Sequence, residues 1–391
     1  MKIIIIVNCT RSLVLFRGKL IERFVQLGHT VIAYSPERDM ETEATLSSIG
    51  AEFHQLPFNR TGTNVVNDFL LLLRIRKILS LEKPDIVLLY TIKPVMYGSI
   101  AAKLAGVPRI YSIITGAGYV FIGTGIMKNS LRLIVSLLYK VALSANKKII
   151  FLNGDDKKLF IERGLINQRS KYYQIYGEGI DITDYQHKQI EKNVVIKSSG
   201  IGLKKYSNSS VDRIIIFLLI ARLLKDKGIR EYAEAARITK EKYPFAYFWL
   251  VGPYDSNPAA ISLNQVEQWV KDGVIIYHGE TRDVRPYIEA SSVYVLPSYR
   301  EGLPRTVLEA MAMGKPIITT NAPGCCETVQ EGINGFLVPV KDAQAIARAM
   351  EQFILHSEII AKMGKSSRSI VEERFDVHKV NDHILRIMEL I

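Results

Sequence analysis

The sequence predicts an α/β protein built from two doubly wound domains, each with a parallel sheet. Short runs of β-branched, almost wholly apolar residues alternate with amphipathic stretches of helical length. This alternation is typical of parallel strands that helices cover on both faces. It fails once, between Lys188 and Ser210, where Ser, Gly and Lys dominate and a linker is expected. The length of 391 residues also suits two domains, at roughly 150 residues for each.

The first half of the chain is expected to form one complete sheet with its covering helices. Its opening apolar run is ended by polar Asn8 and is too short for a signal peptide, so a buried first strand is the better interpretation. The expected strands are Ile3–Asn8, Thr30–Ser35, Glu52–Leu56, Asp85–Leu89, Arg109–Ile114, Lys148–Leu152 and Tyr172–Tyr176. The expected helices are Arg17–Leu27, Val65–Leu81, Met96–Ala105 and Met127–Ser144.

The same alternation restarts in the second half. The expected strands are Arg213–Ile220, Ala246–Val251, Val274–His278, Val293–Leu296, Pro316–Thr319 and Gly335–Val338. The expected helices are Gly228–Lys242, Leu263–Lys271, Val284–Glu289, Arg305–Met313, Ala343–Leu355 and a final Val377–Leu390.

Four segments follow from this pattern. A first domain is expected over residues 1–185, a linker over 186–211, a second domain over 212–373, and a C-terminal helix over 374–391 that packs back toward the first domain. Two Rossmann-like domains of this kind would face each other across a cleft, with ligands at the carboxyl ends of their strands.

Positive charge is concentrated in the first half. The whole chain carries a net charge of +12, and residues 1–180 hold 24 Lys and Arg against 13 Asp and Glu. Such an excess suits a phosphorylated substrate, anionic lipid or nucleic acid, or it forms an ordinary solvated surface. The basic half lacks the interleaved aromatic residues of a strand-binding channel, so no nucleic-acid partner is expected.

Cysteine content and hydropathy indicate in which cellular compartment the protein is expected. The three cysteines argue against a disulfide framework, no spacing suggests a zinc site, and a reducing cytoplasm fits best. No run reaches the ~20 uninterrupted apolar residues of a membrane span. The nearest, Leu131 to Leu152, is broken by Arg132 and Lys140.

The most informative stretch follows the strand expected over Val293–Leu296. A Gly-Leu-Pro turn leads there into a helix, with Glu301 in the turn and Glu309 about two turns along the helix. A helix N-terminus at the carboxyl end of a strand suits an anion such as a diphosphate. A carboxylate on the helix could accept hydrogen bonds from ribose hydroxyls. On the residues alone, two solvated helix glutamates are the more common arrangement.

The full stretch from Pro297 to Val338, PSYREGLPRTVLEAMAMGKPIITTNAPGCCETVQEGINGFLV, resembles the Glu-x7-Glu region of glycosyltransferase family 4, which has the GT-B fold. The resemblance implies that Glu301 contacts hydroxyls of the transferred sugar and that Glu309 binds the donor ribose. It also implies that a stretch of backbone lies against the diphosphate and the sugar, namely Gly302, Leu303 and Pro304.

Two cations match a second element of the family. Arg222 and Lys227 lie five residues apart on the loop after the strand Ile214–Ile220, where the family has an arginine and a lysine. Charge develops on the departing diphosphate as the glycosidic bond breaks, and the two cations would neutralise it. Because the chain has no Asp-x-Asp motif, no metal and no other cofactor is expected.

The resemblance also suggests further contacts with the substrates. The family has a nucleotide-binding loop over Tyr277 to Asp283, which makes Tyr277 and His278 donor-site candidates, although a structural role for His278 is the simpler interpretation. The first domain would bind the acceptor through side chains and glycines that follow its strands. These candidates are Arg11, Ser12, Arg17, Lys93, Gly116 and Gly118.

Within the family, the chain is most similar to bacterial N-acetylhexosaminyltransferases that act on undecaprenyl-diphosphate saccharides. This similarity implies a UDP-sugar donor, N-acetylgalactosamine or N-acetylglucosamine as the sugar, and retention of anomeric configuration. It also implies a place on the inner face of the cytoplasmic membrane, where the helix Met127–Ser144 either packs in the core or lies against anionic lipid.

Three alternative functions are open at this point. One is a GT-B nucleotide-sugar epimerase, which the paired glutamates disfavour. Another is a non-catalytic protein that binds nucleotide sugars, which the retained charged residues disfavour. A dinucleotide oxidoreductase is the third, and it is disfavoured because no Gly-x-Gly-x-x-Gly opens the first helix of either domain.

Overall fold

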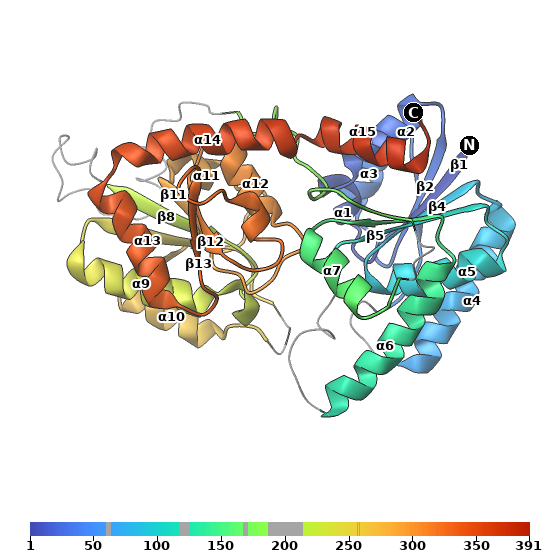
Figure 1. Cartoon of the computed structure of the whole chain (residues 1–391), viewed down its shortest axis with the longest axis horizontal. Coiled ribbons are helices and arrows are strands. Elements are labelled where there is room, and N and C mark those ends of the chain that lie inside the picture. The colour runs from blue at the N-terminus through green and yellow to red at the C-terminus, as the bar shows by residue number, and fades with distance from the viewer. Residues whose placement is uncertain (60–63, 117–125, 167–170, 187–213, 256, 258) are drawn as a thin grey trace. The chain divides into compact units, whose positions relative to one another are not determined.

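The structure is a computed structural model, shown in Figure 1. It describes the whole chain except residues 60–63, 117–125, 167–170, 187–213, 256 and 258, and it leaves out the side chains of residues 126–131. The described residues form two compact units, and each unit is described by itself below. Unit 1 comprises Met1–Gly179 with Val377–Ile391, and unit 2 comprises Ile180–Asp376.

Unit 1 contains a seven-stranded sheet with the order β3-β2-β1-β4-β5-β6-β7. Every neighbouring pair in this sheet is parallel, as the runs of buried apolar residues predict. The strands are β1 Lys2–Ile6, β2 Thr30–Ser35, β3 Glu52–Gln55, β4 Ile86–Tyr90, β5 Arg109–Ile114, β6 Lys148–Phe151 and β7 Tyr172–Gln174.

Helices cover both faces of this sheet, so that each face has its own apolar core. One face packs α1 Ser12–Leu15, α2 Gly18–Gln26, α3 Met40–Ser48 and α15 Val377–Met388. The other face packs α4 Val65–Glu82, a π-helical turn at Pro94–Gly98, α5 Ser99–Leu104, α6 Ile126–Ser144 and α7 Gly154–Glu162. In Figure 1, α4, α5 and α6 lie together on one side of the unit.

The last helix, α15, is attached to unit 1 by polar contacts as well as by its apolar face. Lys148 donates from Nζ to the carbonyl of Ile387 at 2.6 Å, and Tyr111 donates from Oη to the carbonyl of Met388 at 3.0 Å. These contacts satisfy carbonyls that the end of a helix leaves without partners. The C-terminal 15 residues therefore fold with a sheet that lies more than 200 positions earlier in the chain.

Unit 2 repeats the architecture with a six-stranded parallel sheet of order β10-β9-β8-β11-β12-β13. The strands are β8 Ile215–Ile220, β9 Ala246–Val251, β10 Ile276–Tyr277, β11 Val293–Leu296, β12 Ile317–Thr320 and β13 Gly335–Val338. One face packs α9 Ile229–Lys242, α10 Leu263–Lys271 and α13 Ala343–Leu355. The other packs α11 Arg285–Ala290, α12 Arg305–Ala312 and α14 Glu358–Arg374.

The boundary between the units differs from the expected one. The chain enters unit 2 at Ile180, whose N–H donates to the carbonyl of Phe375 at 2.8 Å, so the residues from 180 to 185 belong to the second domain rather than the first. The expected linker over 186–211 lies, apart from its first residue, outside the described part of the chain.

Helix α14 was not expected from the sequence. Its interior contains Gly364 and several serines, which weaken helix propensity. Gly364 has a packing role, because a Cβ built on it would lie 2.0 Å from the carbonyl oxygen of Gly314. The backbone of α14 therefore passes so close to the end of α12 that only glycine fits at this position.

Candidate functional site

The loops that carry the expected donor-site residues leave the same edge of the sheet in unit 2. All neighbouring strands are parallel, so the segments after β8, β9, β10, β11 and β12 follow carboxyl ends that lie side by side. The chain moves from β8 toward β9 on one side and returns to add β11 on the other side. Ligands bind in doubly wound sheets at such a reversal, and the motifs with Lys227 and Glu301 follow β8 and β11.

These two loops are joined by backbone contacts. The N–H of Tyr299 donates to the carbonyl of Asp226 at 2.8 Å, and the hydroxyl of Ser298 donates to the same carbonyl at 3.1 Å. Gly228 has a φ of +69°, and a Cβ on it would lie 2.0 Å from the carbonyl oxygen of Pro297. The close approach requires glycine at the start of α9 and fixes one loop against the other.

The contact places two predicted catalytic residues together. The Nζ of Lys227 lies 2.5 Å from Oε1 of Glu301, and the two side chains are 17% and 15% exposed. The N–H of Glu301 donates to the carbonyl of Pro323 at 2.9 Å, so the loop after β12 supports the turn. A charged pair is thus held in a partly desolvated position, where each charge acts more strongly than it would in water.

Arg222, the other predicted catalytic cation, pairs with a different carboxylate. Its Nη1 lies 2.8 Å from Oδ2 of Asp255, in the loop after β9, while its own side chain remains 56% exposed. Sequence reasoning did not identify Asp255 as a partner, since only the pairing of β8 with β9 brings the two loops together. The guanidinium therefore keeps a solvent-accessible surface beside a carboxylate that orients it.

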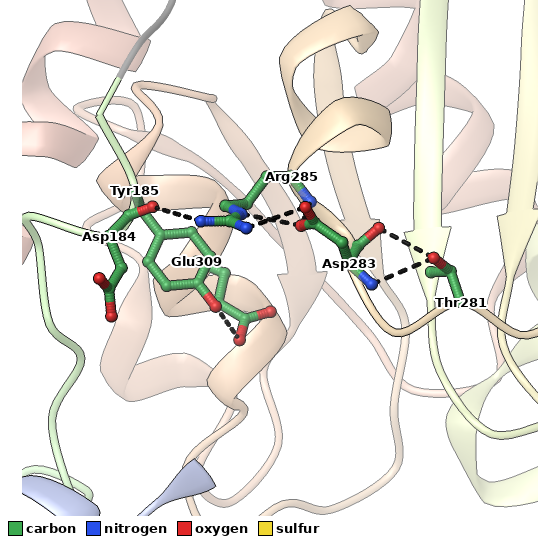
Figure 2. Close-up of polar contacts among 6 residues, drawn as sticks. All are labelled: Asp184, Tyr185, Thr281, Asp283, Arg285 and Glu309. Carbon is green, nitrogen blue, oxygen red and sulfur yellow. Dashed lines mark hydrogen bonds and ion pairs between the residues drawn. The ribbon is translucent and has the colours of Figure 1, made fainter.

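Glu309 is almost fully buried on α12. Its Oε1 accepts hydrogen bonds from Oη of Tyr185 and from Nε of Arg305, each at 2.9 Å. Burial raises the pKa of Glu309, and the positive charge of Arg305 with the hydrogen bond from Tyr185 acts against this rise. Figure 2 shows Tyr185 approaching the carboxylate from the segment that enters unit 2.

The turn between these glutamates has the expected form. Gly302 and Leu303 are partly buried, and Pro304 is buried and precedes the first residue of α12. Leu303 packs against the apolar core beneath α12. The backbone of this turn is therefore held in place from below, at the carboxyl end of β11.

Tyr277 and His278 have structural contacts. Tyr277 donates from Oη to the carbonyl of Gly252 at 2.7 Å, which holds the loop after β9. The imidazole of His278 packs against Trp249 and Tyr287, with ring centroids 4.8 and 5.0 Å apart. Burial lowers the pKa of His278 to about 4, so the ring is neutral at neutral pH.

The predicted acceptor residues of unit 1 follow three different strands, β1, β4 and β5. Arg11 is 56% exposed and lies 3.9 Å from Asp39, whereas Ser12 donates from its hydroxyl to the carbonyl of Cys9 at 2.5 Å. Gly116 follows β5 with a φ of +153°, and Gly118 lies outside the described residues.

Arg17, which is predicted to contact an acceptor, is buried among structural contacts. Its side chain is only 4% exposed, pairs with Glu178 at 3.0 Å and stacks on the ring of Tyr90 at 4.1 Å. Its Nη1 also donates to the carbonyl of Ser12 at 3.0 Å. The guanidinium thus connects the loop after β1 to Glu178, near the point where the chain leaves unit 1. This contact also gives Glu178 a structural role.

Lys93 lines a cavity of about 430 Å³ at the carboxyl ends of β2, β3 and β4. Its Nζ lies 2.6 Å from Oδ1 of Asp68, and Tyr97 donates to Oδ2 of the same carboxylate at 3.0 Å. The remaining lining combines one aromatic ring and three amides with charged and apolar side chains, namely Phe58, Asn59, Asn64, Asn67, Glu37, Arg74, Pro36, Pro57 and Leu70. Polar groups of this kind around an aromatic face suit a sugar or another polyhydroxylated ligand.

Both units match known families of domains. Residues 2–153 match the family described as glycosyl transferase 4-like, and residues 214–356 match the family described as glycosyl transferases group 1. The chain belongs to the glycosyltransferases. The second matched range contains Arg222, Lys227, Glu301 and Glu309.

Solved structures confirm the GT-B fold of this glycosyltransferase. Anabaena HepE in complex with UDP and glucose superposes with a TM-score of 0.77 over 100% of both chains, at 17% identity. A glycosyltransferase from Rickettsia africae gives the same TM-score of 0.77, over 99% of this chain and 97% of that chain, at 21% identity.

Curated relatives are similar over most of the glycosyltransferase chain. The Campylobacter jejuni N,N'-diacetylbacillosaminyl-diphospho-undecaprenol alpha-1,3-N-acetylgalactosaminyltransferase is 28% identical over 82% of this chain and 81% of its own. The Escherichia coli UDP-Gal:alpha-D-GlcNAc-diphosphoundecaprenol alpha-1,3-galactosyltransferase is 28% identical over 82% of this chain and 79% of its own. Among the described residues of this chain, no helix is both long and apolar enough to cross a bilayer.

The support that the loop after β12 gives to Glu301 can be tested at Gly324. This residue has a φ of +77°, and a Cβ on it would lie 2.3 Å from the carbonyl oxygen of Glu301. We expect Gly324→Ala to displace the turn and to lower the rate of glycosyl transfer about 10- to 100-fold, because small misplacements of a reacting group are costly.

Gly332→Ala is the matched control for this substitution. Gly332 has a φ of +72°, so alanine costs a similar ~1–2 kcal/mol of backbone strain, but no atom lies within 4 Å of the added Cβ. Steady-state rates of both variants should separate displacement of the turn from general strain. Equal losses of activity in the two variants would contradict the role assigned to Gly324.

Proposed function

We propose that this glycosyltransferase is a retaining enzyme of family 4. In this proposal it transfers N-acetylgalactosamine or N-acetylglucosamine from a UDP-sugar to an undecaprenyl-diphosphate-linked saccharide in the synthesis of a bacterial glycan. The names of the Campylobacter and Escherichia relatives support the acceptor class, and one of them supports an N-acetylhexosamine as the transferred sugar. The complexes of HepE with UDP and glucose support a uridine nucleotide donor in the same fold.

The observation that carries the proposal is the pairing of Lys227 with Glu301 where the strand order reverses in unit 2. A cation and a carboxylate in contact at this position can bind adjacent parts of one nucleotide sugar. Lys227 would bind the diphosphate, and Glu301 would accept hydrogen bonds from the sugar hydroxyls next to it. Arg222 would add a second cation to the diphosphate, because its exposed guanidinium can reach an anion without leaving Asp255.

The proposed reaction breaks the bond between C1 of the sugar and the β-phosphate oxygen, and the electron pair leaves with UDP. The acceptor hydroxyl oxygen forms the new bond to C1 from the same face, which retains the anomeric configuration. Its proton passes to the departing phosphate oxygen. Lys227 and Arg222 would stabilise the charge that develops on the leaving group, so we propose that no metal is required.

Release of UDP from a panel of UDP-sugars, with and without an undecaprenyl-diphosphate-linked saccharide, tests the proposal. We expect release that depends on the acceptor, prefers one N-acetylhexosamine donor and persists in EDTA. Glu301→Ala and Lys227→Ala should each reduce the turnover about 100-fold or more, because each removes a group that stabilises the transition state.

Lys225→Ala is the matched control, since Lys225 is an exposed lysine of the same loop and should retain near-normal turnover. Near-normal rates for Lys227→Ala or Glu301→Ala would refute the assigned roles. Epimerised donor that appears without an acceptor would refute the transferase reaction itself.

For the acceptor we propose a contact in unit 1 that includes the cavity lined by Lys93. The cavity lies at the carboxyl ends of three parallel strands, where doubly wound sheets bind ligands, and its lining combines an aromatic ring, amides and charges. In the same assay, Lys93→Ala should raise the acceptor KM and leave the donor KM unchanged. A change confined to the donor KM would refute this assignment.

We also propose that the protein binds the inner face of the cytoplasmic membrane through α6. One side of α6 packs in the core, as one of the two expectations states, because Val135 and Ala142 are buried. Four large apolar side chains of the same helix are 51–74% exposed, namely Leu133, Ile134, Leu137 and Val141. An exposed apolar stripe on a basic domain suits the headgroup region of an anionic membrane.

Vesicle sedimentation tests this membrane contact. The wild-type protein should bind vesicles that contain phosphatidylglycerol more strongly than vesicles of phosphatidylcholine alone, and Leu133→Glu with Leu137→Glu should reduce the bound fraction about tenfold. Leu15→Glu is the control, because Leu15 is 54% exposed on α1, which packs on the opposite face of the sheet. Equal binding of the two variants to anionic vesicles would contradict a contact through α6.

A further inference from the structure

The carboxylate of Glu309 is held unequally at its two oxygens. Both Tyr185 and Arg305 donate to Oε1, each at 2.9 Å, while Oε2 has no hydrogen-bond partner among the described residues. The side chain is only 8% exposed. Oε2 is not one of the fully enclosed side-chain atoms without a partner in the described part of the chain, so it reaches solvent and can accept a hydrogen bond from a ligand.

Tyr185 reaches Glu309 from a backbone that is anchored at several points. Arg368 donates from Nη1 to the carbonyl of Tyr185 at 3.2 Å and to that of Ile182 at 3.4 Å. Arg285 donates from Nη1 to the carbonyl of Asp184 at 3.4 Å. The segment leading to the phenol is therefore attached to α14 on one side and to α11 on the other.

Arg285 is itself fixed by a carboxylate. Its Nε and Nη2 donate to the two oxygens of Asp283 at 2.8 and 2.9 Å, and the N–H of Asp283 donates to the hydroxyl oxygen of Thr281 at 3.2 Å. Figure 2 shows this chain of contacts running from Thr281 to Asp184, next to the contact between Tyr185 and Glu309. The loop after β10 and the carboxylate on α12 are thus both connected to the segment that carries Tyr185.

Arg305 completes the arrangement from the same helix as Glu309. It lies one turn earlier, where a side chain of that length can reach the carboxylate along the helix surface. Its donor and the phenol both approach Oε1, so rotation of the carboxylate would break two hydrogen bonds. The second oxygen consequently has a fixed direction, and in Figure 2 it points away from the phenol of Tyr185.

We propose that Tyr185 is a positioning residue for the ribose of the nucleoside diphosphate donor. Together with Arg305 it occupies Oε1 of Glu309, so that Oε2 accepts the hydrogen bonds from the ribose hydroxyls. This inference rests on the proposed function, and on the ribose contact that the resemblance to the family implies for Glu309. It adds a residue from the entry segment of unit 2 to the donor site and predicts discrimination at the ribose hydroxyls.

The substitution Tyr185→Phe removes the phenol hydroxyl and keeps the ring. We expect the KM for the UDP-sugar to rise about tenfold and kcat to change less than twofold, because the lost hydrogen bond positions the ribose and not the reacting bond. Calorimetry of the full chain with UDP and with 2′,3′-dideoxy-UDP gives a second readout. The wild type should prefer UDP, and Tyr185→Phe should lose most of that preference.

Tyr243→Phe is the matched control. Tyr243 also donates to a glutamate in unit 2, to Oε1 of Glu351 at 2.7 Å, but it lies at the end of α9 away from Glu309. It should leave the donor KM and the preference for UDP unchanged.

The outcomes separate the inference from the proposed function. A wild-type protein that binds UDP, with a Tyr185→Phe variant that keeps the full preference over dideoxy-UDP, would overturn the role of Tyr185. An equal loss of affinity for UDP and dideoxy-UDP in Tyr185→Phe would also overturn the role of Tyr185, because the lost affinity would not depend on the ribose hydroxyls. A wild-type protein that binds neither nucleotide would contradict the proposed function itself.

Discussion

The reversal of strand order between β8 and β11 is the constraint on which the site of unit 2 depends. Parallel pairing brings the carboxyl ends of these strands together, and the loops that follow carry Lys227 and Glu301. Both side chains are mostly buried, so each is stabilised by the other and would be costly to leave alone. The backbone contacts between the two loops then fix where the charged pair lies.

Glycine makes these close contacts possible. Gly228 lets the start of α9 approach Pro297, and Gly324 lets the loop after β12 approach Glu301. At both positions the backbone is left-handed and a Cβ would meet a carbonyl oxygen, so two independent restrictions act together. The partly buried pair therefore depends on a framework with little tolerance for displacement, which is what the proposed role in stabilising a transition state requires.

The sequence predicts the fold class and the edge of the sheet at which the candidate site lies, because both depend on local pattern. Alternating strands and helices imply a parallel sheet, and a parallel sheet implies that the loops with Lys227 and Glu301 share one edge. The roles of Tyr185 and Asp255 depend on contacts across more than thirty residues, which no spacing reveals. Arg17 has the residue type and the position of a ligand, but the ring of Tyr90 and the carboxylate of Glu178 enclose it.

A double-mutant cycle on donor binding tests the central claim most directly. Dissociation constants of a UDP-N-acetylhexosamine would be measured for the wild type, Lys227→Ala, Glu301→Ala and the double variant. If the two residues act as one pair on the donor, their effects should be coupled by at least about 1 kcal/mol. Effects that add to within about 0.5 kcal/mol would contradict the account, because residues that bind independently show no such coupling.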